Sequence, residues 1–184
     1  MKTFKIIGTL VLLFTLAGCG KTVVGSSGLL PESLIENTKT VEASQGAVEV
    51  SSSLPSQLFV VDSADFRQGL ENAFAAAGVF AGGKKKYDVR AEIVKLDYPS
   101  FGTGMEAEYV VDYEILDATG HVIGEKKISS KGYCSMGEHF LGSARVYQAI
   151  QKAVEHQYPL IVEYIWEVVG ADLEKNKLSA GIKP

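Results

Sequence analysis

Apolar residues recur at helical spacing in the first half of this chain. One stripe, with steps of four, four and three residues, consists of Phe66, Leu70, Phe74 and Ala77. Residues spaced in this way share one face of an α-helix, so the stripe predicts an amphipathic helix packed on a sheet, with Phe74 buried between them. Asp62 or Ser63 is placed to cap its first turn, and Gly78 stands where a left-handed residue commonly ends a helix.

The middle of the chain alternates apolar and polar residues, which is the period of a strand with one buried face. In the first such strand the apolar positions are Tyr87, Val89, Ala91 and Ile93. In the second they are Ala107, Tyr109, Val111, Tyr113 and Ile115. A turn at 117–120 returns the chain through a third strand at 121–130, so we predict a meander that places Asp112 near Lys126. The acidic positions of the second strand then form a solvated sheet face, with a ligand surface as the alternative.

Further elements are predicted on both sides of this pattern. Two short β-leaning runs, at 47–50 and 58–61, precede the first helix, and we expect one of them to be the first strand. A long helical segment, roughly 138–169, follows the meander. Pro159 lies inside it and lacks a backbone N–H, which predicts a kink or a break near 155–158.

These elements together indicate an α+β domain. We expect a small antiparallel sheet, in β-α-β-β-β-α order, with two helices packed on one face. The single domain is placed at 47–172, followed by a C-terminal tail at 173–184. Residues 19–46 are rich in Ser, Thr, Gly and Glu, and we interpret them as a flexible tether.

Residues 1–18 have the layout of a secretory signal peptide. Lys2 and Lys5 precede an apolar run at 6–16, which is shorter than the roughly 20 residues that a membrane-spanning helix needs. The run ends in Leu16-Ala17-Gly18-Cys19, which resembles the lipobox of bacterial lipoproteins. That resemblance implies cleavage before Cys19 and covalent lipid on its thiol, so that the protein is anchored to a membrane and faces the periplasm.

The residue after the cysteine bears on which membrane is used. Gly20, rather than an Asp, follows Cys19. By resemblance to the enterobacterial sorting rule, this favours the outer membrane over the inner one. The alternatives to a lipid anchor are an ordinary signal peptide with a chance cysteine at its cleavage site and an N-terminal membrane helix.

Charge and cysteine content narrow the function classes. The formal net charge of -4 at pH 7 argues against nucleic-acid binding, which needs a clustered basic surface. With Cys19 lipidated, Cys134 has no partner for an intramolecular disulfide. We interpret Cys134 as a small buried apolar residue, with a reactive thiol or an intermolecular bridge as alternatives.

The sequence contains no catalytic or metal-binding motif. Gly82-Gly83-Lys84 lacks the Ser or Thr that follows the lysine of a phosphate-binding loop. The histidines, none of which has a second histidine at metal-ligand spacing, are His121, His139 and His156. A site that brings Cys134 together in space with Glu138 or His139 is the alternative. We therefore expect no catalytic residue, no metal and no cofactor apart from the lipid on Cys19.

A second resemblance concerns the mature domain. It is carried by residues 66–70 with 78–80, by 87–93, by the turn at 117–120 and by 140–145. These patterns of residue class are similar to those of small periplasmic lipoproteins that serve envelope machines, such as the LPS-assembly lipoprotein and the auxiliary lipoproteins of lipid-trafficking ABC transporters. The likeness brings no functional residue with it.

This resemblance implies a non-catalytic binding or accessory module for envelope assembly or transport. Its partner would be an envelope protein or a lipid-like ligand. Two alternatives remain: a small lipid-anchored enzyme that uses Cys134 or a metal, and a structural component of a secretion or surface-organelle apparatus.

Overall fold

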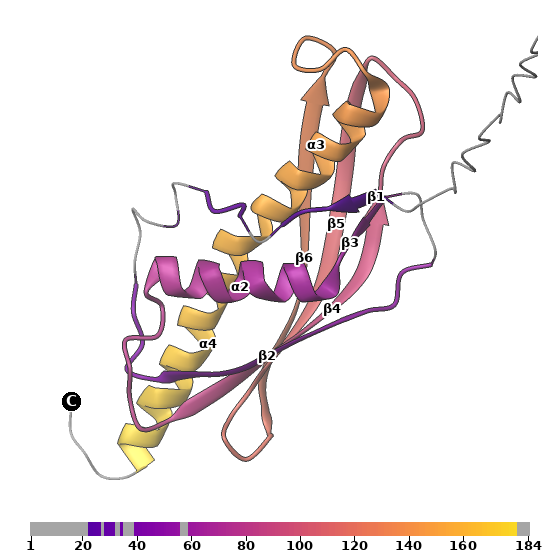
Figure 1. Ribbon diagram of the computed structural model, residues 1–184. Coiled ribbons are helices and arrows are strands. Elements are labelled where there is room, and N and C mark those ends of the chain that lie inside the picture. The colour runs from indigo at the N-terminus through magenta and orange to yellow at the C-terminus, as the bar shows by residue number, and fades with distance from the viewer. Residues whose placement is uncertain (1–21, 27, 32–33, 35–38, 56–58, 180–184) are drawn as a thin grey trace, which may run out of the picture.

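A four-stranded mixed sheet is the centre of the protein (Figure 1). The computed structural model describes residues 22–26, 28–31, 34, 39–55 and 59–179. In spatial order the strands are β2 (Ser44–Ser52), β4 (Lys86–Asp97), β5 (Gly104–Leu116) and β6 (Val122–Ser135). The meander β4-β5-β6 is antiparallel as predicted, but β2 is parallel to β4. A helix lies between β2 and β4 in the chain, and such a crossover returns the second strand in the same direction as the first.

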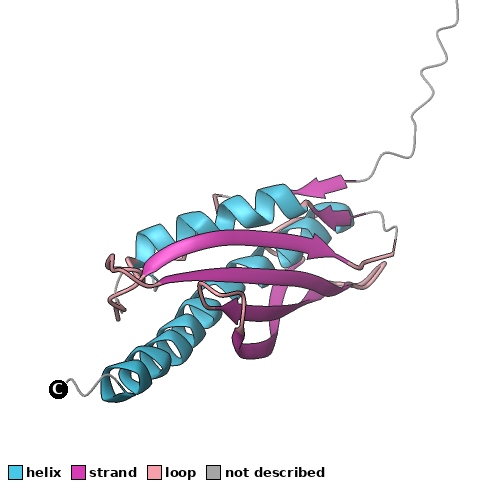
Figure 2. Ribbon diagram, turned by 90° about the horizontal axis from the view of Figure 1, so that it is seen from below, coloured by secondary structure: helices cyan, strands magenta, loops and turns pink. Residues whose placement is uncertain are grey.

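Three helices and a two-stranded sheet complete the described part of the fold. The helices are α2 (Ser63–Ala77), α3 (Gly142–Glu155) and α4 (Gln157–Ser179). The small sheet pairs β1 (Thr22–Val24) in parallel with β3 (Phe59–Val61). Both runs that could have been the first strand are therefore strands, and β1 precedes them. Figure 2 shows α2 lying along one side of the main sheet, and in Figure 1 α3 and α4 follow one another across it.

The two faces of the main sheet differ in polarity. The positions that the period-two pattern assigned to the apolar face of β4 and β5 are all buried. On the opposite face, charged side chains pair across the strands, as in Lys95–Glu108 (2.6 Å) and Lys131–Glu106 (2.8 Å). The α+β fold is therefore confirmed, and the acidic side chains of β5 lie on the sheet face opposite the core, where Glu106 is exposed and the others are half-buried.

The first helix has the predicted ends. The Asp62 carboxylate accepts hydrogen bonds from the backbone N–H groups of residues 64 and 65, which are free in the first turn. Gly78 ends the helix in the left-handed conformation, with φ of 58°. Phe74 is 1% exposed within the core, as expected from its place on the apolar stripe.

The second helical segment divides at the predicted place but begins later than predicted. α3 ends at Glu155 and α4 begins at Gln157, so Pro159 occupies the first turn of a new helix, where its missing N–H breaks no hydrogen bond. Residues 138–141, which were expected to be helical, form a loop instead. The N–H groups of Glu138 and His139 donate to the carbonyl oxygen of Ser135 and so close a turn directly after β6.

The register of the β5–β6 hairpin corrects one predicted contact. Asp112 lies opposite Lys127, with 3.3 Å between carboxylate and ammonium, and not opposite Lys126. Leu116 pairs with Val122 whereas the preceding residue of β5 pairs with Gly124, so β6 contains one extra residue. This bulge moves every later pair along by one position.

The predicted tether is the largest correction. Val24 and Ser26 are fully buried, and the Tyr158 hydroxyl donates to the Ser26 carbonyl oxygen at 2.8 Å. The N–H and hydroxyl groups of Ser26 both donate to the Asp65 carboxylate. The described residues of 19–46 therefore pack on the domain, because a short apolar strand with a buried partner is more stable docked than solvated. Residues 1–21, including Cys19, lie outside the described residues.

The C-terminal boundary also differs from the prediction. Helix α4 continues to Ser179 and includes the described residues of the segment interpreted as a tail. Leu173, Glu174 and Lys175 favour helix, and no proline or glycine interrupts the sequence between Gly170 and Ser179. No described helix is long and apolar enough to cross a membrane.

Candidate functional site

Two loops at one end of the main sheet expose large apolar side chains. Residues 98–103 join β4 to β5 and residues 136–141 join β6 to α3. Gly104 pairs with Ser135, so the two loops leave the sheet side by side, and both lie at the upper end in Figure 1. The exposed fractions are 87% for Phe101, 44% for Met136, 87% for Phe140 and 66% for Leu141. We call these four residues the apolar tip, because exposed apolar residues gathered in one place mark an interaction site whereas single ones do not.

Arg145, near the start of α3, holds the two loops together. Its Nη1 donates to the carbonyl oxygens of His139 (2.9 Å) and Phe140 (2.7 Å), and its Nη2 donates to that of Gly102 (2.8 Å). Only 6% of Arg145 is exposed. The planar guanidinium presents several donors in a fixed geometry, so one side chain sets the position of both loops relative to α3.

A cavity of about 530 Å³ opens beside this arginine. Its walls include Phe59, Tyr98, Phe101, Met105, Arg145 and Val146. The volume lies within the range of small-molecule sites, and the mostly apolar walls also include Ser100, Ser143 and Arg145 as polar members. The cavity is therefore our candidate ligand site.

The charge of Arg145 bears on which ligand groups this cavity favours. Its Nε is buried and has no hydrogen-bond partner among the described residues. Within the same residues no carboxylate forms a salt bridge with it, and its known partners are neutral carbonyl groups. A buried cation compensated only by dipoles favours an anionic ligand group, because a charge is best compensated by an opposite charge.

Cys134, the residue of the enzymatic alternative, is buried in the core. Its exposed fraction is 0%, and its thiol donates to the Gln148 side-chain oxygen at 3.4 Å. Burial, together with the negative charge of Glu138, raises the pKa of the thiol above its ordinary value. The protonated form is favoured, and this is the less nucleophilic one.

The neighbours that could have activated Cys134 have other partners. The Glu138 carboxylate accepts hydrogen bonds from the Lys152 ammonium and from the N–H and hydroxyl groups of Ser135. These bonds, that of Lys152 first, lower the pKa of Glu138 to about 2, so it is ionised and engaged. His139 is exposed and contributes its carbonyl oxygen to Arg145. Cys134, Glu138 and His139 are thus close in the sequence, but each interacts with a different partner: Gln148, Lys152 and Arg145.

The other predicted chemistry can be located as well. His156 lies at the end of α3, and its Nδ1 is 2.7 Å from the carbonyl oxygen of Lys131 in β6. His121 follows the β5–β6 turn and is exposed. Among the residues that the structure describes, no three His, Cys, Asp or Glu side chains are grouped closely enough to hold a metal ion.

Neither the apolar tip nor Arg145 was predicted to be functional, although residues 140–145 carry part of the resemblance of the mature domain. Phe140 and Leu141 were assigned to a helix, where apolar residues are expected to be buried. A signal was nevertheless present: Phe101 stands among Pro, Ser and Gly, and Phe140-Leu141 directly precedes Gly142. Large apolar residues among turn-forming residues are placed on the surface by the backbone.

Comparison with known proteins places the fold but not a family. No protein-family model matches the sequence, and no curated protein matches it either. Among solved structures, protein XCC0632 from Xanthomonas campestris, which carries the family designation DUF330, has a TM-score of 0.54 and 11% identity, over 84% of this chain and 96% of that one. Protein CT253 from Chlamydia trachomatis has a TM-score of 0.50 and 11% identity, over 83% of this chain and 99% of that one.

A minor lipoprotein from Acinetobacter baumannii is a more distant match. Its TM-score is 0.45 and its identity 15%, over 65% of this chain and 90% of that one. At these identities the likeness to the Xanthomonas and Chlamydia proteins shows a shared fold, and that fold spans nearly the whole of both.

Proposed function

We propose that this protein is a lipid-anchored periplasmic binding module that serves cell-envelope assembly or transport and performs no catalysis itself. The anchor is Cys19, at the end of the sequence that resembles a lipobox. Gly20 after the cysteine favours the outer membrane. The ligand is lipid-like, with an apolar part and an anionic group.

The observation that carries this proposal is the cavity beside Arg145. Its apolar walls accept acyl or other apolar groups, and the positive charge of Arg145 in its wall attracts a phosphate or carboxylate. The raised pKa of the buried Cys134 thiol supports a binding role over the enzymatic alternative.

The anchor is tested by metabolic labelling with a radioactive fatty acid. The wild-type protein should be labelled and the Cys19→Ser variant should not, because the thiol is the acceptor of the lipid. Cys134→Ser is the matched control, since it removes the other cysteine and should keep the label. Equal labelling of wild type and Cys19→Ser would contradict the anchor.

The ligand site is tested with two fluorescent short-chain lipids, a phosphatidic acid and the uncharged diacylglycerol. We expect the mature protein to bind the phosphatidic acid more tightly, and Arg145→Gln to lose this difference. Lys127→Gln makes the same charge change on the exposed sheet face and should bind as wild type does. Because Arg145 also holds the loops, Ser143→Phe is a second variant: it fills the cavity from the first turn of α3 and should weaken binding of both lipids. Equal binding by wild type and Ser143→Phe would exclude the cavity.

The absence of catalysis is tested by complementation of a deletion strain. Cys134→Ala and His139→Ala should each restore envelope resistance to detergent at normal abundance of the protein. Removal of a catalytic nucleophile costs several orders of magnitude in rate, so failure of both stable variants would support the enzymatic alternative.

A further inference from the structure

The start of the described chain lies next to the loops of the apolar tip. Thr22, the first residue of β1, pairs with Phe59 of β3. The Phe59 ring makes an edge contact with the Tyr98 ring, at 5.4 Å between centroids. The backbone N–H of Phe59 donates to the Tyr98 hydroxyl. Tyr98 is the first residue of the loop that carries Phe101. The β1 entry therefore lies in the half of the molecule that carries the apolar tip (Figure 1).

The length of chain before β1 limits the distance between the anchor and this half of the molecule. Cys19 and Thr22 are three residues apart in the sequence. A fully extended chain spans at most about 3.6 Å per residue, so the Cys19 backbone lies within about 11 Å of Thr22. A lipid on Cys19 thus brings the membrane surface close to the loops of residues 98–103 and 136–141.

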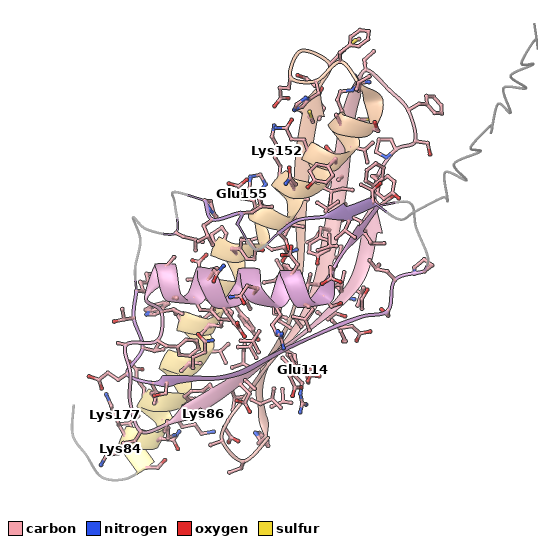
Figure 3. All side chains as sticks on the ribbon, in the orientation of Figure 1. Lys84, Lys86, Glu114, Lys152, Glu155 and Lys177 are labelled. Carbon is pink, nitrogen blue, oxygen red and sulfur yellow. The ribbon has the colours of Figure 1, made fainter. Side chains whose placement is uncertain are left out.

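The charge distribution fits one orientation toward that surface. Apart from Glu138, whose carboxylate is paired with Lys152, the two loops contain no Asp, Glu, Lys or Arg. The lysines labelled at the opposite end of the molecule in Figure 3 are Lys84, Lys86 and Lys177. The loops near the anchor therefore contain few charged residues of their own, although Asp97 and Lys152 border them, and the far end carries several lysines.

We infer that the apolar tip is seated in the bilayer that holds the Cys19 lipid, with Phe101, Phe140 and Leu141 inserted among the headgroups and upper acyl chains. This inference rests on the proposed anchor. We assign a lipid surface as the partner of the apolar tip. The short chain from Cys19 brings the bilayer near the tip whether or not a protein partner is present. Exposed Phe and Leu side chains enter the interface readily, and the aromatic ring prefers this depth.

Arg145 makes this insertion effective. A flexible loop must lose conformational freedom when its apolar residues enter the bilayer, which weakens binding. The three hydrogen bonds from Arg145 hold the backbone on both sides of the tip before any contact with lipid. Phe101 and Phe140 are thus presented on a preorganised surface.

The test places a single tryptophan at the tip of the mature, lipidated protein. Trp166 is the only tryptophan of the chain, so Trp166→Phe gives a silent background. Phe101→Trp and Phe140→Trp are the two probes, and Leu178→Trp, exposed on α4 at the far end, is the matched control. The positions at the tip are 87% exposed, so these changes leave the core intact, which circular dichroism verifies.

Each variant is reconstituted in vesicles of phosphatidylethanolamine and phosphatidylglycerol, with and without phosphatidylcholine brominated high on its acyl chains. Side chains at the interface are buried about 5–10 Å, within contact of these bromines, so we expect emission from both tip probes to fall roughly twofold. The Leu178→Trp emission should not change. A second arm puts a benzophenone amino acid at position 140 in cells, where cross-links to phospholipid are expected.

Each other outcome overturns a defined part of the inference. Protein that fails to float with the vesicles contradicts the Cys19 anchor, and the seated tip with it. Protein that floats while both tip probes are unquenched contradicts the seated tip alone. Equal quenching at the tip and at residue 178 excludes a specific orientation, and cross-links from position 140 to protein without phospholipid show that a protein covers the tip.

Discussion

Replacing Arg145 by Leu removes the group that joins the two loops of the apolar tip. Three charge-assisted hydrogen bonds to backbone carbonyl oxygens are lost, at 2.7–2.9 Å in the native protein. At about 1.5–3 kcal/mol each, they give an upper bound of about 5–9 kcal/mol. The freed carbonyl groups lie in exposed loops and recover water, and Leu retains part of the buried alkyl contact. We therefore expect the free energy of unfolding to fall by about 2–4 kcal/mol.

Two further variants separate the geometry of Arg145 from its charge. Arg145→Lys keeps the charge but not the planar set of donors, so about half of the loss is expected to remain. Lys131→Leu removes an exposed cation from the pair with Glu106 and should leave the urea midpoint close to that of wild type, because solvent screens this pair.

The assay is urea unfolding followed by circular dichroism, combined with amide hydrogen exchange. Exchange in residues 98–103 and 136–141 should accelerate, at about tenfold for each 1.4 kcal/mol of local stability lost. An unchanged urea midpoint with unchanged exchange in both loops would refute the role of Arg145. Loss of stability without faster loop exchange would show that the residue acts through packing alone.

Three further predictions concern the core. Phe74→Ala should lower the free energy of unfolding by about 3–5 kcal/mol, and a urea midpoint equal to that of wild type would show that its helix face is misassigned. Burial raises the pKa of Tyr109, Tyr113 and Tyr158 above the ordinary value of 10.0. The tyrosines of the unfolded chain therefore ionise at lower pH than those of the folded protein, so their contribution to stability is fully present below pH 10. It falls as the pH rises further, by about 1.4 kcal/mol per pH unit for each tyrosine. Urea midpoints that stay constant from pH 9 to pH 11 would contradict this. The buried Cys134 should react with Ellman's reagent only slowly in the native protein and rapidly in denaturant, and equal rates would contradict its burial.

Local patterns in the sequence determined the meander, the first helix and the division between α3 and α4. Alternation at 87–93 and 107–115 is a property of each strand by itself, and so is the stripe that buries Phe74. Pro159 removes a hydrogen bond whatever the rest of the chain does. These features could be predicted because neighbouring residues decide them.

Features that depend on distant partners could not be predicted in this way. Thr22–Val24 is too short to be recognised as a strand, and it gains its order from Phe59–Val61 and from contacts beyond it. The extra residue in β6 depends on how the β5–β6 turn closes, and it moved the partner of Asp112 by one position. Arg145 was missed for the same reason, since two of its acceptors follow β6 and the third precedes β5.

The parallel pairing of β1 with β3 has a mechanical consequence. Tension on the proposed lipid at Cys19 would enter β1 at its first residue, and β3 leads at its far end into α2, which is packed in the core. Force along this path loads all the β1–β3 hydrogen bonds at once in shear instead of opening them one after another. The bond from Tyr158 to Ser26 reinforces the joint just beyond β1. A pull on such an anchor is therefore resisted by the whole β1–β3 pair and by the Tyr158 bond together.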